Sequence, residues 1–411
     1  MAEYQVHQLK NGIRLVHQQL SDASNGHVAH LGLIIDTGSR DELPHQNGLA
    51  HFIEHVIFKG TERRKAYHIL SRLEDIGGEL NAFTSKEETV IEAAFLAQHY
   101  ARTLELFADI VFHSVFPEKE LKKEQEVVID EINAYKDTPS EQIFDDFDCL
   151  LFPDHPLGKN ILGTKKLVKS FNRDAVIQFI KQSYTTDKMV ISSVGSIDFP
   201  KLVKLFERYF GEEAANLSHT KREPINGYIP VEQVKKRRLF QSHCMIGNRA
   251  YGMKDDKRTA FSLLNNFLGG PGLNSRLNLA IREKYGFTYN LESNYTAFSD
   301  IGNFSIYIGT DKNYLDRSIE LVHKELKLLR DKKLGPLQLK KAKLQFSGQI
   351  AISEESNAVK MHNNGRSLLS YGRISTLSEV HQKIQKVSAE DIIDVANEIF
   401  DPTQMSMLIF K

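Results

Sequence analysis

The stretch RDAVIQFIKQSYTTDKMVISSVG, residues 173–195, has the same pattern as AEDIIDVANEIFDPTQMSMLIF, residues 389–410. Both begin with acidic residues typical of a helix start, followed by apolar residues at helical spacing. An aromatic residue, a turn that contains threonine, a methionine and an apolar strand then follow in that order. Because order and spacing agree as well as composition, we infer that the chain is a duplication of one unit. Chance similarity of two short helix–strand units is the alternative.

The segment between the two copies contains the best candidate for a linker. Residues 211–228, GEEAANLSHTKREPINGY, are polar, include Pro and Gly, and show no clear apolar period. This pattern predicts domains at residues 1–213 and 229–411, joined by residues 214–228. Both halves mix strand patterns with clusters of helical patterns, so we expect the α+β class. The expected fold is two homologous α+β domains, each a mostly antiparallel sheet with helices packed against it.

The first half can be divided further. Asn11-Gly12 is a strong turn pair between two alternating apolar runs, which predicts a β-hairpin at the start of the chain. Apolar periodicity then predicts the following elements: a strand at 28–36, helices at 47–58 and 70–76, strands within 80–94, and helices at 98–113 and 117–135.

Composition excludes several classes of protein. Among the 411 residues, 53 are Lys or Arg and 53 are Asp or Glu, so the balanced charge argues against binding to nucleic acid or to a membrane surface through bulk positive charge. Two cysteines, Cys149 and Cys244, are too few for a disulfide framework. The first residues lack a signal-peptide pattern and no apolar run approaches membrane-spanning length, so we expect a cytoplasmic protein without membrane insertion.

The segment His51-Phe52-Ile53-Glu54-His55 is the sharpest chemical feature. On a helix, His51 and His55 lie four residues apart on one face, where both imidazoles can bind one cation. Glu54 lies on nearly the same face. The surrounding residues are apolar, which is not typical of a solvated charged face. The alternative is a pair of packed histidines with an incidental glutamate.

A third ligand is needed, and the helical pattern after Pro117 offers candidates. One face of this helix carries Leu121, Val127, Val128, Ile132 and Tyr135, with Glu124 and Glu131 in the middle of the face. Carboxylates on a core-facing stripe are costly unless they are paired or bind a metal. Glu131 and Glu124 are therefore candidates for a ligand and a supporting residue, with pairing to arginines or backbone donors as the alternative. A His, His, Glu set with one open position is typical of catalytic zinc.

The residues around the motif resemble a known family. HFIEHVIFKGT, residues 51–61, resembles the zinc helix of the pitrilysin, insulin-degrading-enzyme and mitochondrial-processing-peptidase family, whose inverzincin motif reverses the commoner His-Glu-x-x-His order. GGELNAFTSKEETV, residues 77–90, and HPLGKNILGT, residues 155–164, match two further blocks. Family spacing implies Glu131 as the third zinc ligand and Glu124 as its supporting glutamate. The resemblance covers essentially the whole chain and is to short, two-domain bacterial members.

The resemblance also implies roles for other residues. Glu54 is implied as the general base of a zinc metalloendopeptidase that hydrolyses oligopeptides or unstructured segments through a zinc-activated water. Arg282 and Tyr289, seven residues apart in the second half, match the pair that binds substrate and stabilises the oxyanion in active members. Asn81-Ala82-Phe83 matches the edge strand that binds substrate peptides, with an ordinary internal strand as the alternative.

The second half is expected to lack a metal. When Phe267-Leu268-Gly269 is placed against Phe58-Lys59-Gly60, the positions of the motif are occupied by Ala260, Leu263 and Leu264. We therefore expect one Zn²⁺ per chain. Because short relatives close their chamber by dimerising, a homodimer is implied, with peptides as the other partners.

Two other functions remain open. One is a non-catalytic core or scaffold subunit of the same fold, which the intact motif residues argue against. The other is a nucleotide-binding protein that uses the glycines at 269–272, for which no Walker pattern is present.

Overall fold

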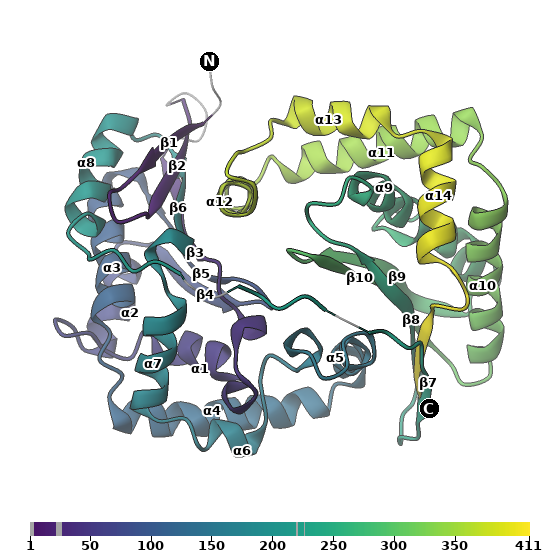
Figure 1. The fold of residues 1–411 in the computed structure, drawn as a ribbon, viewed down its shortest axis with the longest axis horizontal. Coiled ribbons are helices and arrows are strands. Elements are labelled where there is room, and N and C mark those ends of the chain that lie inside the picture. Colours follow the sequence, from purple (N-terminus) through teal and green to yellow (C-terminus); the bar gives the residue numbers. More distant parts are fainter. Residues whose placement is uncertain (1–3, 22–26, 219–220, 226) are drawn as a thin grey trace. The chain divides into compact units, whose positions relative to one another are not determined.

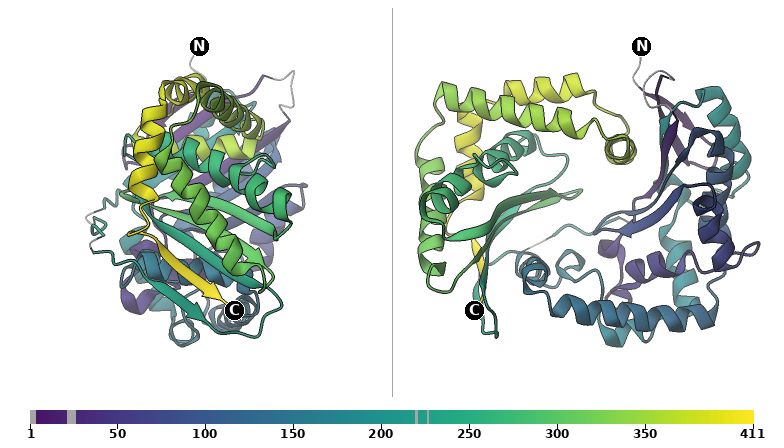
Figure 2. Two further views of the ribbon diagram at one scale, coloured as in Figure 1. Left: turned by 90° about the vertical axis from the view of Figure 1, so that its right-hand side faces the viewer. Right: turned by 180° about the vertical axis from the view of Figure 1, so that it is seen from behind.

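The computed structural model describes residues 4–21, 27–218, 221–225 and 227–411, and it divides into two compact units, each containing one sheet (Figure 1; Figure 2). The first unit consists of Met1–Asn133, Asn160–Arg222 and Ile352–Thr376. The second consists of Ala134–Lys159, Glu223–Ala351 and Leu377–Lys411. Each unit is therefore built from three separate parts of the chain.

The first sheet has the strand order β1-β2-β6-β3-β5-β4. Its strands are β1 (Gln5–Gln8), β2 (Arg14–Gln19), β6 (Met189–Gly195), β3 (Val28–Ile35), β5 (Thr89–Leu96) and β4 (Glu79–Thr84). All neighbours are antiparallel except the parallel pair β2 and β6. The hairpin expected at the start of the chain is confirmed, with Gly12 at φ +101° in its turn.

The second sheet repeats this topology. Its order is β7-β11-β8-β10-β9, and only β7 and β11 are parallel. The strands are β7 (Glu232–Lys235), β11 (Ser406–Phe410), β8 (Ser242–Tyr251), β10 (Ile301–Thr310) and β9 (Thr288–Ala297). Strand order and direction match β2-β6-β3-β5-β4, so both the predicted α+β class and the predicted duplication are confirmed.

The four helices expected at 47–58, 70–76, 98–113 and 117–135 are present with shifted ends, and the structure contains further helices for which no bounds were expected. The first half contains α1 (Leu49–Val56), α2 (Ala66–Glu74), α3 (Tyr100–His113), α4 (Glu118–Lys136), α5 (Pro139–Leu151), α6 (Lys165–Val168), α7 (Arg173–Ser183) and α8 (Phe199–Phe210). The second half contains α9 (Arg258–Gly269), α10 (Leu315–Asp331), α11 (Pro336–Ser353), α12 (Asn357–Tyr371), α13 (Leu377–Lys386) and α14 (Ala389–Ile399). The two repeated segments form α7 with β6 and α14 with β11. No helix of the described ranges is both long and apolar enough to cross a membrane.

Two helices pack on the sheet of the opposite half of the sequence. Helix α12 contacts β3 and β6 of the first sheet, and α5 contacts β8 and β11 of the second (Figure 1). The alternation of β3 explains how: Leu31 and Leu33 face the core beneath the helices of the first half, whereas Gly32 and Ile34 face α12. Each sheet is thus covered on both faces.

The packing of these helices bears on the domain boundaries. The ranges 1–213 and 229–411 put α5 in the first domain and α12 in the second, whereas each helix packs in the other compact unit. Of the expected linker 214–228, residues 219–220 and 226 lie outside the described residues, and the described remainder has no regular secondary structure. Arg222 anchors this segment to the first unit through Asp36 and Asp41.

The close approach of α12 to the first sheet generates a stability prediction. A Cβ atom on Gly365 of α12 would lie 2.2 Å from Ile34 Cδ1 and 2.9 Å from Ser192 Cβ. We expect Gly365→Ala to lower the free energy of unfolding by roughly 1–2 kcal/mol, because overpacking outweighs the gain in helix propensity. Chemical denaturation measures this change.

Gly348 of α11 provides the matched control, because a Cβ there would meet nothing within 4 Å. Gly348→Ala should stabilise the protein by roughly 0.5–1 kcal/mol. Equal effects of the two substitutions would contradict the packing of α12 described above.

Candidate metal centre

The start of α1 is shaped by two glycines. Gly48 precedes the helix at φ +96°, and Gly163 lies against it at φ +70°. A Cβ on Gly48 would come within 2.7 Å of Leu162 O, and one on Gly163 within 2.3 Å of Asn47 O. Side chains larger than hydrogen are therefore excluded from both positions, and the chain can turn tightly into the helix that carries the histidines.

Glu42 binds the first turn of α1. Its carboxylate accepts hydrogen bonds from the Gly48 N–H (3.0 Å), the Ala50 N–H (2.8 Å) and the Asn47 side-chain amide (3.3 Å). Burial raises the pKa of Glu42 to about 8, although these donors favour the charged form. Glu42 satisfies helix N–H groups that would otherwise lack partners, so it fixes where α1 begins.

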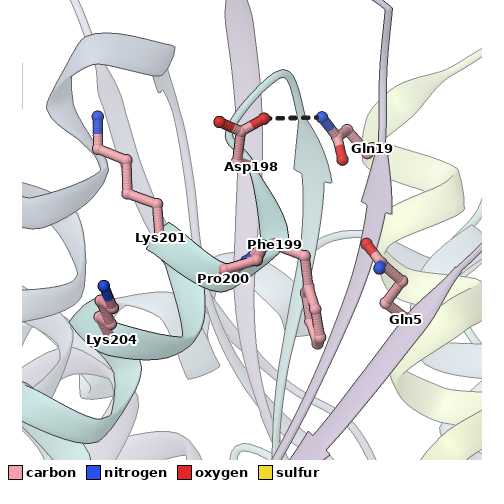
Figure 3. Close-up of a pocket in the computed structure, with 7 residues that line it drawn as sticks. All are labelled: Gln5, Gln19, Asp198, Phe199, Pro200, Lys201 and Lys204. Atoms are coloured by element: carbon pink, nitrogen blue, oxygen red, sulfur yellow. Dashed lines mark hydrogen bonds between the residues drawn. The ribbon is translucent and has the colours of Figure 1, made fainter.

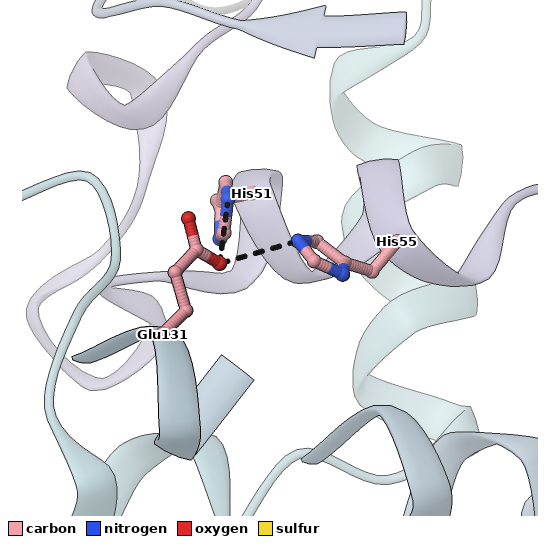
Figure 4. A group of neighbouring side chains, drawn as sticks. All are labelled: His51, His55 and Glu131. Carbon is pink, nitrogen blue, oxygen red and sulfur yellow. Dashed lines mark ion pairs between the residues drawn. The ribbon is translucent and has the colours of Figure 1, made fainter. Parts of the chain in front are cut away.

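The structure brings the side chains of His51, His55 and Glu131 together. The two histidines project from α1 and Glu131 from α4, toward one point (Figure 4). Glu131 Oε2 lies 3.7 Å from His51 Nε2 and 3.5 Å from His55 Nε2. One potential ligand atom from each residue lies within 4.8 Å of the others.

These distances fit a metal better than a hydrogen-bonded cluster. They exceed the usual 2.7–3.2 Å of an N–H···O hydrogen bond. Ligands about 2.0–2.1 Å from a tetrahedral zinc ion stand about 3.3–3.4 Å from one another, close to the observed separations. Burial, together with nearby His55, lowers the pKa of His51 to about 4, so this imidazole is neutral and can act as a ligand. The nitrogen and oxygen donors of this group suit zinc.

Glu124 supports the group from behind His55. Its Oε2 lies 3.4 Å from His55 Nδ1, and its Oε1 forms an ion pair with Lys59 Nζ at 2.7 Å. Its side chain is 11% exposed, whereas that of Glu131 is 43% exposed. The prediction of which residues form the apolar face of α4 is partly wrong, because Val127 is 48% exposed and Ile129 is buried instead.

Glu54 lies on α1 between the two histidines and next to the end of β4. Burial raises the pKa of its carboxyl, while hydrogen bonding by Thr84 and the nearby His55 oppose this rise. Thr84, the last residue of β4, also donates its hydroxyl to Ala50 O at 3.4 Å. These contacts place one end of β4 against the helix of the histidines.

Asn81, Ala82 and Phe83 lie on β4, which is an edge strand of the first sheet. The strand pairs with β5 on one side, and Asn81 and Phe83 are exposed. An ordinary internal strand, the alternative considered from the sequence, is therefore excluded at this position. Phe83 packs against His362 of α12, with ring centroids 5.4 Å apart.

Arg282 and Tyr289 both lie in the second unit. Arg282 is in a π-helical turn at Asn278–Glu283, and Tyr289 is 81% exposed on β9. Close packing accounts for Gly269 at the end of α9, because a Cβ there would come within 2.8 Å of Ser293 N on β9.

Helix α9 takes the place in the second sheet's topology that α1 takes in the first. It lies between β8 and β9 in the chain as α1 lies between β3 and β4. Ala260, Leu263 and Leu264, the counterparts of His51, Glu54 and His55, are buried in the apolar core of the second unit. The residues of α9 at these positions carry no metal-binding side chain.

A surface cavity of about 510 Å³ lies elsewhere in the first unit (Figure 3). It is lined by Gln5, Gln19, Asp198, Phe199, Pro200, Lys201 and Lys204. None of the site residues expected from the sequence contributes to it, and Asp198 places a negative charge beside its two lysines. The cavity therefore adds nothing to the candidate metal centre.

Sequence reasoning missed Glu42, Lys59 and Thr84. Glu42 and Thr84 act on backbone groups of α1, and Lys59 acts on a carboxylate of another helix. None of them stands at a spacing typical of metal ligands. Only the closeness of Lys59 to the histidine motif could have drawn attention to it.

Comparison with known proteins places these features in a family. A family model described as Insulinase (Peptidase family M16) matches residues 19–165, and one described as Peptidase M16 inactive domain matches residues 170–346. A protein named an uncharacterized zinc protease from Bacillus subtilis is 35% identical, covering 95% of this chain and 94% of the relative. Another protein with the name uncharacterized zinc protease, from Rickettsia bellii, is 32% identical, and the match covers 99% of this chain and 97% of the relative.

A solved structure has the same fold. The crystal structure of a protease from Helicobacter pylori matches with a TM-score of 0.91 over 100% of both chains, at 22% sequence identity. At this identity the match is evidence for the fold of the present chain, not for its activity.

The contacts of Glu42 generate a stability prediction. We expect Glu42→Gln to lower the free energy of unfolding by roughly 2–3 kcal/mol, because an amide NH₂ would replace an acceptor oxygen beside buried N–H donors. Chemical denaturation measures the change. Glu126→Gln on the exposed side of α4 is the control and should change stability by less than about 0.5 kcal/mol. A Glu42→Gln protein as stable as this control would show that the cap contributes little.

Proposed function

The chain belongs to the insulinase family of peptidases, peptidase family M16, and we propose that it is a zinc endopeptidase that cleaves extended peptides and unstructured polypeptide segments. The observation that carries this proposal is the convergence of His51, His55 and Glu131, with Glu54 on the same helix and an edge strand beside it. The names of the zinc protease relatives support the choice of metal.

The donor set assigns roles to the residues of the centre. His51, His55 and Glu131 would hold the ion, and Glu124 would orient His55. A zinc ion bound there would lower the pKa of water and polarise the peptide carbonyl. Glu54 would act as the general base, taking a proton from the attacking water and returning it to the leaving amine. A carboxyl whose pKa is raised by burial suits a group that must both accept and release a proton.

Strand β4 supports binding of extended substrates. An edge strand offers main-chain donors and acceptors, and a peptide can pair with them largely without regard to its side chains. We assign this role to Asn81, Ala82 and Phe83. Because Thr84 connects β4 to α1, a peptide paired with the strand would run toward the metal centre. Sequence preference should therefore be loose, and very short peptides should be poor substrates.

The second half contributes through other residues in this proposal. Arg282 would hold a carbonyl or carboxylate of the substrate, and Tyr289 would donate to the oxyanion that forms during attack. The apolar counterparts on α9 support one zinc per chain. We further propose a homodimer in which these two residues of one subunit complete the metal centre of the other.

The alternative is a non-catalytic core subunit. It is disfavoured by the complete set of donors and by Glu54, which a scaffold would not need. Digestion of a quenched-fluorescence peptide library by the purified protein, with and without a chelator, tests the choice directly. Cleavage that stops with chelator and returns with Zn²⁺ supports the peptidase, and no cleavage by zinc-loaded protein would favour the scaffold.

The proposed roles predict opposite effects of two isosteric substitutions. Glu131→Gln should lower zinc affinity by at least about tenfold, because it removes a charged ligand. Glu54→Gln should retain about one zinc per chain and lose roughly 10²-fold or more in peptide cleavage, because it removes the base. Elemental analysis and the peptide assay measure the two properties.

Glu126→Gln, on the exposed side of α4 close to Glu124, is a control for a changed charge outside the centre. Its zinc content should match that of the unsubstituted protein. Loss of zinc from Glu54→Gln would mean that base and ligand are assigned the wrong way round. Two zinc ions per chain would contradict a metal-free second half.

Complementation tests the proposed shared site. Tyr289→Phe should keep zinc and lose roughly 10²–10³-fold in rate, because an oxyanion donor is removed. Mixing inactive Glu54→Gln and inactive Tyr289→Phe chains should restore activity, since one mixed site would contain an intact base and an intact tyrosine. If native mass spectrometry verifies subunit exchange but activity does not return, each site is built within one chain.

A further inference from the structure

Lys59 lies just beyond the last turn of α1 and is held there by the backbone. Its N–H donates to Val56 O at 3.1 Å, and Gly60, at φ +149°, bridges to Lys65. The Gly60 carbonyl in turn accepts from the Val115 N–H at 3.1 Å. The start of the Lys59 side chain is therefore fixed relative to α1.

The ammonium of Lys59 meets one oxygen of Glu124, while the other oxygen of Glu124 faces His55. The separations are 2.7 Å for Lys59 Nζ to Glu124 Oε1 and 3.4 Å for Glu124 Oε2 to His55 Nδ1. The lysine side chain is 27% exposed and that of Glu124 is 11% exposed. Lys59, Glu124 and His55 thus form a row of contacts that ends at a proposed metal ligand.

The physical need for Lys59 follows from the burial of Glu124. A carboxylate out of water is stable in its charged form only when it is paired. A charged Glu124, whose Oε2 lies 3.4 Å from His55 Nδ1, favours the tautomer with the proton on Nδ1, which leaves Nε2 facing Glu131. Without Lys59, the carboxylate would lose its strongest contact and could turn away from His55.

We propose that Lys59 is a positioning residue for the metal centre, acting through Glu124 to hold the ring of His55 in its metal-binding tautomer and orientation. The inference rests on the metal site of the proposed function but adds a residue that the sequence pattern did not indicate. It also predicts the direction in which metal affinity changes when Lys59 is removed. A positive charge near the site repels a cation, so removal of Lys59 would tighten metal binding if charge alone mattered. Positioning predicts the reverse.

Metal binding by the apo-protein tests this inference without an activity assay. Competition with a fluorescent chelator measures the affinity for Zn²⁺ and Co²⁺, and the visible spectrum of the Co²⁺ protein reports the ligand geometry. Lys59→Met should weaken binding by about 10-fold or more and change the Co²⁺ spectrum, in line with other residues that orient metal ligands. Lys59→Arg should restore both, because arginine can also pair with Glu124.

Lys123→Met is the matched control. Lys123 precedes Glu124 on α4, but its ammonium is exposed and pairs with Glu120. The substitution removes the same charge close to the same site without touching Glu124. It should leave metal affinity and spectrum unchanged, and thermal melts of all variants should show that each is folded.

A double-mutant cycle separates action through Glu124 from any direct effect. Glu124→Gln alone should weaken metal binding, and Lys59→Met should add little to it. Additive effects, or a Lys59→Met protein that binds metal as tightly as the unsubstituted chain or more tightly, would overturn the inference. If the unsubstituted chain binds metal but cleaves no peptide, the proposed peptidase fails while Lys59 keeps its role. A chain that binds neither ion would overturn both.

Discussion

A short helix in an apolar core has to carry polar groups at fixed positions, and this constraint governs the first unit. Helix α1 buries Phe52, Ile53 and Val56 in the apolar core while it presents His51, Glu54 and His55 on its other side. Eight residues of helix are too short to be stable alone, so tertiary contacts must fix its position.

Those contacts act at both ends of α1. Glu42 binds the N–H groups of the first turn, and the Lys59–Glu124 pair lies beside the last turn. Both carboxylates are buried, and each is stabilised by several donors or by a cation. Since a buried carboxyl group can be satisfied only in a narrow range of geometries, these contacts specify the register of α1 as well as contributing to its stability. The positions of both histidines follow from that register.

The second unit shows the same topology without this constraint. At the corresponding positions of α9, Ala260, Leu263 and Leu264 pack into the core. A helix that presents no ligands can be stabilised by apolar packing alone. In the first half, α1 has to meet two requirements: it covers the core, and it holds a set of donor side chains that is open to solvent through Glu131. In the second half, α9 has to meet only the first requirement. This difference explains how one topology can serve as a site in one half and as a core in the other.

Local patterns predicted much of this structure, and their limits are physical. The spacing of His51 and His55 and the carboxylates on α4 depend on helical periodicity, which a single sequence contains. The periodicity placed Val127 inside, but the stripe on α4 is rotated toward Ile129, because tertiary packing sets the rotation of a helix. Glu42 could not be found in this way, since two of its partners are backbone N–H groups that depend on the turn into α1. Lys59 could not be found because its partner Glu124 is distant in sequence. The sequence also did not predict that α5 packs on the second sheet and α12 on the first. An amphipathic pattern shows that a helix has a partner but not which one.

The exchange of α5 and α12 has a consequence for the site itself. On the face of the first sheet opposite α1, His362 of α12 pairs with Glu92 of β5 at 2.6 Å and packs against Phe83 of β4. The edge strand proposed to bind substrate is thus supported by a helix that the chain supplies from its second half. A first half produced alone would expose this face of its sheet and leave β4 without that support. The second half of the sequence is therefore needed to complete the unit that contains the candidate metal centre.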